Sequence, residues 1–344
     1  VYKRQLDTFD EAIGRIRAEE ALERALVGEQ AAFDWDSRIT NSEGASFTRA
    51  RGASALVTSS GFSGGDTGTY ASIVVTPVAD DEGGKKRRGY HWSASRHYAT
   101  LDPSKAVGEE AARRTVAQLG AKKLKTQELP VVFDRDAARS ILGLFAGCVL
   151  GGSIWRKSSY LVDRVGSKVA SDLVTIVDDP LLVRGPGSRP FDGEGLLSRR
   201  TRVVRGGELE TFLLDTYSAR KLGLRSTASA SRSPSGGISA STSNFRLEPG
   251  SLSREALIAD TPHGLYVTAM MGFGFNSVTG DFSRGASGFL IENGELGHPV
   301  SEVTISLNLD QLLQRIDAVA DDIDQRTSIA SPTFRVSSMT LAGG

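Results

Sequence analysis

The residues whose types could support chemistry centre on positions 136–161. An apolar, glycine-rich helical pattern runs there into a basic turn at 155–159. A helix that packs this tightly could carry the ligands of a catalytic metal, which proteins supply as His, Cys, Asp or Glu. Between Arg139 and Trp155, however, the segment contains no His, Asp or Glu, and the single candidate is Cys148.

Cys148 allows two interpretations. A cysteine paired with a histidine could act as a nucleophile that hydrolyses an amide. Reactivity needs a lowered pKa, and no charged residue lies one helical turn from Cys148 to lower it. Free cysteines are among the most buried residue types, so we favour a buried thiol on an apolar helix and keep a Cys148-dependent hydrolase as an alternative.

The other metal-ligand types do not form a recognisable set. The four histidines are His91, His97, His263 and His298, and no two of them have the spacing of ligands on one helix. The acidic groups at 178–179, 281 and 292 lie beside Pro, Gly or Asn, which is typical of turns. We therefore predict no metal site in this chain.

The first part of the chain combines helices with strands. Apolar residues at helical spacing predict one or two amphipathic helices over 9–33 and a further helix over 106–119. Short alternating runs broken by glycine predict antiparallel strands over 39–99. A basic linker at 122–126, followed by a strand at 129–133, places our domain boundary between one domain at 1–126 and a second at 127–344.

The second domain is predicted to be mainly antiparallel β with a few helices, so the fold class is α+β. Strand-like runs lie at 173–177, 201–204, 211–214, 265–270, 286–291 and 300–307. An amphipathic helix is expected over 310–323 and a last strand over 334–341. The segment 225–244 consists almost entirely of small residues and Arg, so it is either mobile or ordered by what it contacts.

Composition narrows the functional classes. The 344 residues suffice for two domains, and 41 acidic residues balance 41 basic ones. This balance disfavours a protein that binds nucleic acid or a membrane surface, and the basic run 85–88 lies beside an acidic one, as at a hairpin tip. The longest apolar run, 141–154, is shorter than the roughly 20 residues of a membrane helix. The single Cys favours a reducing compartment, so we expect a cytoplasmic protein.

Long stretches of the chain resemble one known family. They are RITNSEGASF and SSGFSGG near the start, GSIWRKSSYLVDRVGSKVASDLVTIVDDPLL, TRVVRGGELETFLLDTYSARKLGLRSTASASR, and MMGFGFNSVTGDFSRGASGFLIENGELGHPVSEVTI. In this order, from about Asp10 to the C-terminus, they are similar to the TldD/PmbA family of metalloproteases. The resemblance implies an N-terminal α/β portion, truncated here relative to the family, followed by a mainly β domain.

The resemblance also implies which chemistry this chain has lost. TldD-type subunits carry HExxxH on a helix, where the histidines bind zinc and the glutamate activates water. Those positions fall at Gly143, Leu144 and Cys148, and the tail lacks the cysteine that TldD-type chains add near their C-terminus. The chain therefore resembles a PmbA (TldE)-type subunit without a cofactor of its own, and zinc is expected in a TldD-type metalloprotease partner.

Two segments are candidates for contact with an unfolded peptide substrate. In the family, the segment that follows FLLDTYSARKLG lies close to the catalytic cleft. The glycine-rich run 270–288 could pair with a peptide strand at a sheet edge, or its glycines could serve a sharply bent β structure alone. The candidates are Ser229, Ser231, Arg232, Gly272, Gly274 and Arg284.

These observations predict a non-metal-binding subunit that assembles with a TldD-type metalloprotease and helps to process unfolded peptides. This chain alone is expected to be inactive. Two alternatives stay open: a homo-oligomeric protein that holds peptides without cleaving them, and an independent hydrolase that uses Cys148.

Overall fold

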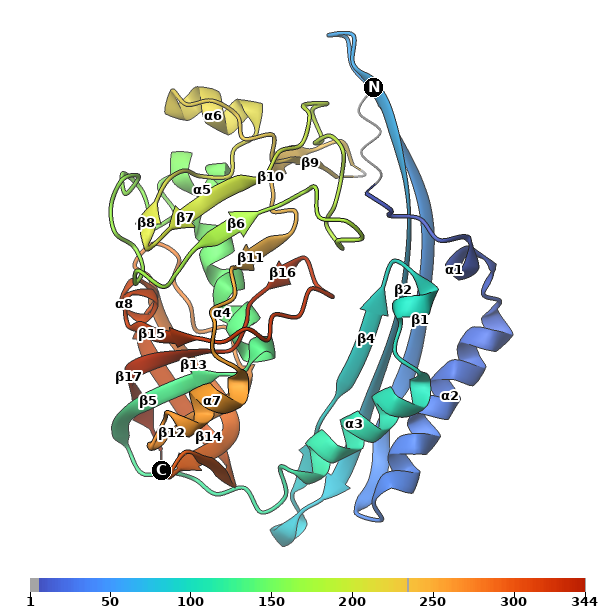
Figure 1. Ribbon diagram of the computed structural model, residues 1–344, viewed down its shortest axis with the longest axis vertical. Coiled ribbons are helices and arrows are strands. Elements are labelled where there is room, and N and C mark those ends of the chain that lie inside the picture. The colour runs from blue at the N-terminus through green and yellow to red at the C-terminus, as the bar shows by residue number, and fades with distance from the viewer. Residues whose placement is uncertain (1–5, 234, 344) are drawn as a thin grey trace.

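The computed structural model describes residues 6–233 and 235–343, which form two lobes lying side by side (Figure 1). Residues 6–116 make the N-terminal lobe, residues 127–343 make the C-terminal lobe, and the stretch 117–126 joins them. The fold is α+β, as the sequence predicts. None of the helices in the described ranges is both long and apolar enough to cross a membrane.

The N-terminal lobe is an antiparallel sheet packed against helices. Its elements are α1 (Glu11–Arg15), α2 (Ala18–Trp35), β1 (Ile39–Val57), β2 (Ser63–Asp80), β3 (Lys86–Arg88), β4 (His91–Ser95) and α3 (Ser104–Val116), with 3-10 turns at Glu82–Gly84 and Tyr98–Thr100. The strand β2 pairs with all three other strands. The helices α2 and α3 approach closely because Gly28 faces Gly108, where an added side chain would lie 1.9 Å from the Gly28 carbonyl oxygen. The predicted helices and antiparallel strands of this region are confirmed.

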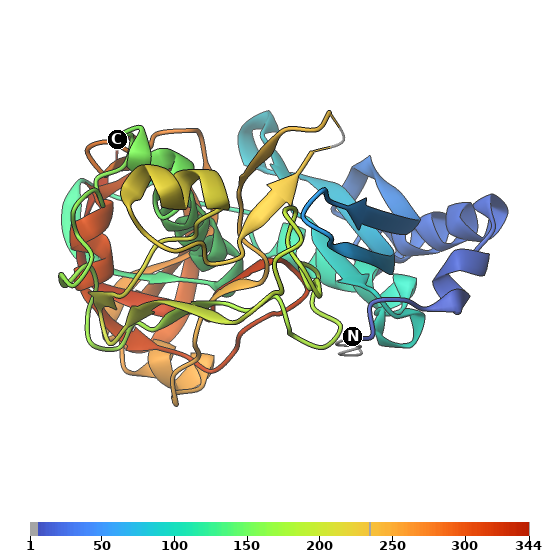
Figure 2. The ribbon, with the colours of Figure 1, turned by 90° about the horizontal axis from the view of Figure 1, so that it is seen from above.

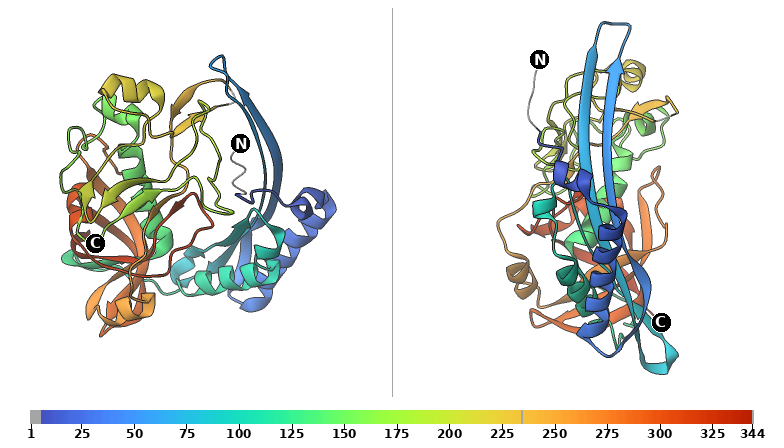
Figure 3. Two further views of the ribbon diagram at one scale, coloured as in Figure 1. Left: turned by 45° about the horizontal axis from the view of Figure 1, so that its top comes forward. Right: turned by 90° about the vertical axis from the view of Figure 1, so that its right-hand side faces the viewer.

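The strands β1 and β2 form a long hairpin that extends beyond the helices (Figures 1 and 3). The outer part of β1 is exposed along almost its whole length, so this part of the hairpin has little core to hold it. Its tip instead contacts the C-terminal lobe, where the rings of Phe62 and Phe191 meet edge to face at 4.9 Å between centroids. The hairpin thus connects the lobes at its far end.

The C-terminal lobe is built on a closed β-barrel. The strands β14 (Glu295–Asn308), β13 (Asp281–Glu292), β12 (His263–Met271), β5 (Gln127–Phe133) and β17 (Phe334–Ala342) are neighbours in this order, and β14 pairs back to β17. A further strand, β15 (Ile316–Val319), extends the sheet from β17. Only the pair of β12 with β5 is parallel among these, so the predicted mainly antiparallel arrangement is confirmed.

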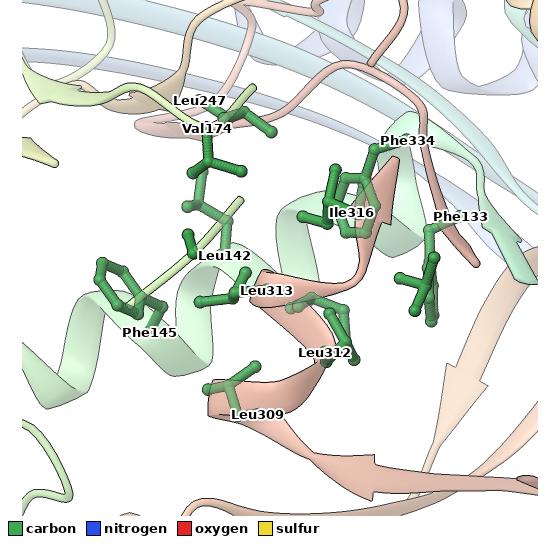
Figure 4. Packing of buried hydrophobic residues seen from close by; sticks show 14 of the residues in the cluster. Phe133, Leu142, Phe145, Val174, Leu247, Leu309, Leu312, Leu313, Ile316 and Phe334 are labelled. Atoms are coloured by element: carbon green, nitrogen blue, oxygen red, sulfur yellow. The ribbon is translucent and has the colours of Figure 1, made fainter. Parts of the chain in front are cut away.

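The helix α4 (Arg135–Cys148) lies between the barrel and a second sheet (Figure 1). That sheet has the order β16 (Ile329–Ala330), β11 (Phe245–Leu247), β6 (Ile176–Asp178), β7 (Thr201–Arg205) and β8 (Glu208–Leu209). Leu142 and Phe145 of α4 join one continuous core with Leu312 and Leu313 of α8 (Leu309–Gln314) (Figure 4). The remaining elements are α5 (Gly151–Trp155), α6 (Thr216–Leu222), α7 (Arg254–Ala259), β9 (Ala230–Arg232) and β10 (Ile238–Ala240).

Two predicted elements of this lobe are wrong. Only Leu309–Gln314 of the expected helix 310–323 is helical, because the residues that follow pair as β15 with β17. Asp317 on β15 accepts a hydrogen bond from Arg335 Nε on β17 at 2.9 Å, so tertiary pairing overrides the helical spacing of the apolar residues. The run 211–214 contributes only an isolated bridge, from Leu213 to Leu150.

A cluster of two arginines, two aspartates and a tryptophan near the N-terminal end of α4 connects the lobes. We call it the interlobe junction (Trp92, Asp102, Arg139, Asp324 and Arg326). The guanidinium carbons of Arg326 and Arg139 lie 4.7 and 5.3 Å from the centroid of the Trp92 ring. Arg326 also donates to Asp324 at 2.6 Å, to Asp102 at 3.2 Å and to the Trp92 carbonyl at 3.0 Å. Each nitrogen of the Arg326 guanidinium group therefore has at least one acceptor within the junction.

Candidate functional site

The three positions where a metal motif would stand, Gly143, Leu144 and Cys148, all lie on α4. Asp134 caps this helix by accepting from the Asp136 N–H at 3.0 Å, and an apolar face then holds it in the core. Gly143 is partly exposed, Leu144 is partly buried against the core, and Cys148 is fully buried. These side chains offer no imidazole or carboxylate, and no group of three or more His, Cys, Asp and Glu in the described residues could hold a metal ion.

The Cys148 thiol lies in an environment that suppresses reactivity. Burial raises the pKa of Cys148 to about 12, which outweighs the opposing hydrogen bond from the Ser159 side chain. The thiolate, which is the nucleophile, is therefore nearly absent at neutral pH. No histidine among residues 6–233 and 235–343 is hydrogen-bonded to Cys148. This geometry opposes the alternative in which the chain hydrolyses amides through Cys148.

The helix that was predicted to run into the basic turn breaks after Cys148. Leu150 adopts an extended conformation and bridges to Leu213, and the Gly151 N–H donates to the Leu213 carbonyl at 2.8 Å. The chain then restarts as the short helix α5. Gly151 is required there because an added side-chain carbon would lie 2.2 Å from Ser218 Oγ on α6. The break therefore seats α5 directly against α6.

The short helix α6 is fixed by signals at both of its ends. Asp215 is its N-cap and accepts from the Ser218 N–H at 2.6 Å. Gly223 ends the helix in the left-handed region with φ 67°. The last turn carries Arg220 and Lys221, both exposed, where a cation is favoured by the helix dipole.

The segment 225–244, which the sequence leaves either mobile or ordered by contacts, folds into the hairpin β9–β10 apart from position 234, which lies outside the described residues. Asp192 orders it, because its carboxylate accepts from the Ala230 N–H at 3.1 Å while the Gly193 N–H donates to the Ala230 carbonyl at 2.8 Å. Ser229 is buried and shares a hydrogen bond of 2.9 Å with Thr227. Ser229 therefore packs inside the protein, and its predicted role in substrate binding stays a prediction.

The helices α5 and α6 and the strand β10 lie near one another at one end of the C-terminal lobe (Figures 1 and 2). Between them is a groove of about 280 Å³. Its walls include Trp155 and Arg156 from the α5 side and Tyr217 from α6, with β10 opposite. The rings of Trp155 and Tyr217 meet edge to face at 5.7 Å. The lining residues are Leu150, Gly152, Ser153, Trp155, Arg156, Asp215, Tyr217, Ser218, Ile238, Ser239 and Ala240.

The edge of β10 that faces away from β9 has no strand partner within the described residues. The Ser241 N–H donates to the Ser229 carbonyl and the Ser233 N–H donates to the Gly237 carbonyl, both at 2.8 Å. In an antiparallel pair the residues between such positions direct their N–H and C=O groups away from the partner strand. Ile238 and Ala240 therefore present their main-chain groups away from β9, and nothing in the described residues pairs with that edge.

The predicted substrate-binding residues separate into two groups. Ser231 and Arg232 lie on β9, and Arg232 is the cross-strand partner of the groove residue Ile238. Arg232 Nε donates to the Gly193 carbonyl at 3.2 Å. No hydrogen bond in the part of the chain that the structure describes joins this hairpin to the second group, which lies at the β12–β13 end of the barrel.

The second group belongs to a tightly bent β structure. Gly272 is exposed in a turn with φ 87°, and a side chain on Gly274 would lie 1.7 Å from the Ser283 carbonyl oxygen. Arg284 on β13 lies 5.9 Å from the ring of Phe282, and its strand is paired on both sides, with β12 and β14. The close approach to Ser283 therefore explains why position 274 needs a glycine. A peptide-binding role for this group stays a prediction.

Sequence reasoning missed the groove itself. Its aromatic pair comes from two helices that are about sixty positions apart in the chain, and its free edge comes from a segment with no strand-like apolar pattern. One local signal was available, because each of the two aromatic residues is followed closely by a pair of cations: Arg156 and Lys157, and Arg220 and Lys221.

Comparison with known sequences agrees with this fold over nearly the whole chain. The PmbA/TldA metallopeptidase central domain matches residues 11–119, and the PmbA/TldA metallopeptidase C-terminal domain matches residues 126–343. Metalloprotease PmbA of Escherichia coli O157:H7 is 39% identical over 338 residues, which cover 98% of this chain and 72% of that relative. A PmbA homolog of Haemophilus influenzae is 39% identical over 95% of this chain and 71% of its own length. A TldD homolog of the same organism is 29% identical over 71% of this chain and 53% of its own length.

Solved structures share the architecture. A candidate modulator of DNA gyrase from Bacteroides thetaiotaomicron superposes with a TM-score of 0.92 at 29% identity, over 100% of this chain and 76% of that one. TldE of Thermococcus kodakarensis has the same fold, with a TM-score of 0.83 at 24% identity over 99% of this chain and 76% of its own. Taken together, the two domain matches and the 39% identity to metalloprotease PmbA show that this chain belongs to the PmbA/TldD metallopeptidase family.

Proposed function

We propose that this chain is a PmbA/TldE-type subunit that binds no metal and acts together with a TldD-type metalloprotease subunit on unfolded peptides. In this division of labour the partner holds zinc and performs hydrolysis. This chain supplies the groove between α5, α6 and β10, which holds the peptide in an extended form.

The observation that carries the proposal is the set of side chains at the motif positions of α4. Gly143 has no side chain, Leu144 packs against the core, and the Cys148 thiol is buried with a raised pKa. A zinc ion would need three or four ligands from His, Cys, Asp or Glu, and Gly143 and Leu144 have no ligand atom to offer. This supports the proposal that the catalytic metal is supplied by a partner subunit.

The free edge of β10 supports the peptide-binding part. An unfolded peptide can add to such an edge through main-chain hydrogen bonds, which depend little on its sequence. The N–H and C=O groups of Ile238 and Ala240 have the alternation that an added strand requires. The pair Trp155 and Tyr217 forms an apolar wall beside this edge for one of the peptide's side chains.

The relatives support the pairing with a second subunit. Haemophilus influenzae carries both a PmbA homolog and a TldD homolog that are similar to this chain. Two paralogues with one fold can divide metal binding and peptide binding between them.

Cleavage of an unstructured peptide tests the proposal. The full chain is assayed alone, and then mixed with a zinc-loaded TldD-type subunit with and without a chelator. We expect chelator-sensitive cleavage in the mixture that exceeds cleavage by the TldD-type subunit alone, and no cleavage by this chain alone. Equal rates for the mixture and the TldD-type subunit would contradict the proposal.

The oligomeric state of the purified chain distinguishes the proposed hetero-complex from the alternative of a homo-oligomer that only holds peptides. A stable homodimer that binds peptides and does not associate with a TldD-type subunit would favour a peptide-holding protein without catalysis. Sedimentation of the chain alone and of the mixture, at equal concentrations, separates the two cases.

A further inference from the structure

Four cations lie in or next to the walls of the groove. Arg156 lines it, Lys157 is the next residue in the chain, and Arg220 and Lys221 lie against the Tyr217 ring. Arg156 lies with its guanidinium carbon 5.2 Å from the Trp155 ring centroid, while the corresponding carbon of Arg220 and the Lys221 Nζ lie 5.9 and 5.5 Å from that of Tyr217. Lys157 follows Arg156 and is exposed. Within residues 6–233 and 235–343, none of these four cations forms an ion pair. We call them the groove cations (Arg156, Lys157, Arg220 and Lys221).

The acidic residues nearby are engaged elsewhere. Asp215 is buried and its carboxylate caps α6 through the Ser218 N–H. The Glu194 carboxylate accepts from the Thr216 N–H at 2.8 Å, at the opposite end of α6 from Arg220 and Lys221. Both carboxylates keep their negative charge, but they lie at the N-terminal end of α6 and form no ion pair with the groove cations, whose hydrogen-bond donors stay available to a ligand.

The groove cations differ in this respect from the other run of cations in the chain. The run 85–88 is equally basic, yet each of its four side chains forms an ion pair, with Glu302, Asp80, Asp81 and Glu43 in that order. The chain thus neutralises a structural cluster of cations and leaves the cluster around the groove free.

We infer that the groove selects extended peptide segments that are rich in Asp and Glu. The inference rests on the proposed peptide groove and adds the class of peptide. The peptide main chain would pair with Ile238 and Ala240, and its carboxylates would meet the groove cations. Arginine would contribute most, because its planar guanidinium can bind a carboxylate through two hydrogen bonds. An apolar or aromatic side chain in the same segment would contact Trp155 and Tyr217.

Binding measured on this chain alone tests the inference without any cleavage. Three fluorescein-labelled peptides of equal length and equal apolar content carry Glu, Gln or Lys at the variable positions, and fluorescence anisotropy gives their affinities at low and at physiological salt. We expect the Glu peptide to bind at least tenfold more tightly than the Gln peptide at low salt. Its advantage should shrink as salt screens the exposed charges, and the Lys peptide should bind most weakly.

Charge reversal supplies the matched variants. The double variant Arg220→Glu with Lys221→Glu should lose the preference for the Glu peptide and bind the Lys peptide instead. Arg49→Glu with Lys125→Glu reverses two exposed cations that lie away from the groove and form no ion pair in the described ranges, so it should leave all three affinities within twofold of wild type. Circular dichroism confirms that both variants are folded.

Each other outcome has a definite meaning. Equal affinity for the Glu and Gln peptides would overturn the preference for acidic peptides but would still support peptide binding in the groove. Absence of binding for all three peptides would instead overturn the groove and the proposed function with it. Tighter binding of an oligothymidylate than of the Glu peptide would overturn the inference in favour of single-stranded nucleic acid, which also combines negative charge with stacking.

Discussion

The two ends of α4 use the same side-chain types for opposite purposes. At its N-terminal end, in the interlobe junction, Arg326 and Arg139 contact Trp92, and Arg326 also binds two carboxylates and a carbonyl. Beyond its C-terminal end, Arg156 and Arg220 contact Trp155 and Tyr217 but have no acidic partner in the described residues. The first set of arginines is satisfied within the chain, and the second is not.

This difference separates charges that hold the fold from charges that are available to a ligand. A guanidinium with several partly buried partners contributes to stability, and its removal leaves those partners unpaired. An exposed guanidinium without a partner contributes little to stability and keeps its hydrogen-bonding capacity free. The predictions below test this contrast from the largest expected effect to the smallest.

Removal of the central junction arginine should have the largest effect. Arg326→Ala leaves Asp324 without its ion pair and releases Trp92, so we expect the free energy of unfolding to fall by about 2–4 kcal/mol. Arg156→Ala should change it by less than about 0.5 kcal/mol because no ion pair is lost. Urea denaturation of both variants measures the difference. Similar losses of unfolding free energy for the two variants would contradict the difference between the two sets of arginines.

Introduction of a methyl group between α5 and α6 should disturb the groove from within. The new carbon of Gly151→Ala would lie 2.2 Å from Ser218 Oγ and 2.9 Å from a methyl of Leu214, so the two helices must separate. We expect a loss of about 1–3 kcal/mol in the free energy of unfolding together with weaker peptide binding. Thermal unfolding and anisotropy of the same preparation check both parts, and unchanged binding would show that α5 and α6 do not shape the groove.

Lowering the pH should reduce the stability of the folded chain through His91, which directly precedes Trp92 of the interlobe junction. Burial, and next the nearby Arg114, lower the pKa of His91 from 6.5 to about 4 in the folded chain. The unfolded chain therefore binds this proton below about pH 6.5 while the folded chain does not. Stability from His91 is fully present above pH 7 and is lost as the pH falls toward 4, by about 1–2 kcal/mol after allowance for its partial exposure. His91→Gln should flatten the stability profile over this range, and an unchanged slope would contradict the assignment.

The vacated position on α4 should accept a methyl group without cost. A side-chain carbon at Gly143 would meet only Ile329 Cδ1, at 3.8 Å, inside a regular helix. Gly143→Ala should therefore raise the free energy of unfolding by about 0.5–1 kcal/mol through helix propensity alone. A loss of stability or of activity in the mixed complex would show that the bare backbone at Gly143 has a function.

The sequence predicts elements better than it predicts the site, for physical reasons. The helices over 9–33 and 106–119 follow from local apolar spacing, and the last strand at 334–341 from its alternation. The helix expected over 310–323 fails because cross-strand partners on β17 decide the conformation of Ile316 and Val319. The groove depends on contacts between segments far apart in the chain, such as Gly151 against Ser218 and Asp192 against Ala230, which no local pattern encodes.

One measurement tests the central claim most directly, namely peptide cleavage by a zinc-loaded TldD-type subunit mixed with this chain or with its Ile238→Pro variant. Proline removes the N–H that Ile238 directs away from β9 and leaves the Ser241 and Ser233 bonds that hold β10 to β9. The account predicts no cleavage by this chain alone, and at least tenfold slower cleavage of the peptide with the variant than with wild type or Ile238→Val, in complexes of equal size. Cleavage by this chain alone, or an equal rate with Ile238→Pro, would contradict it.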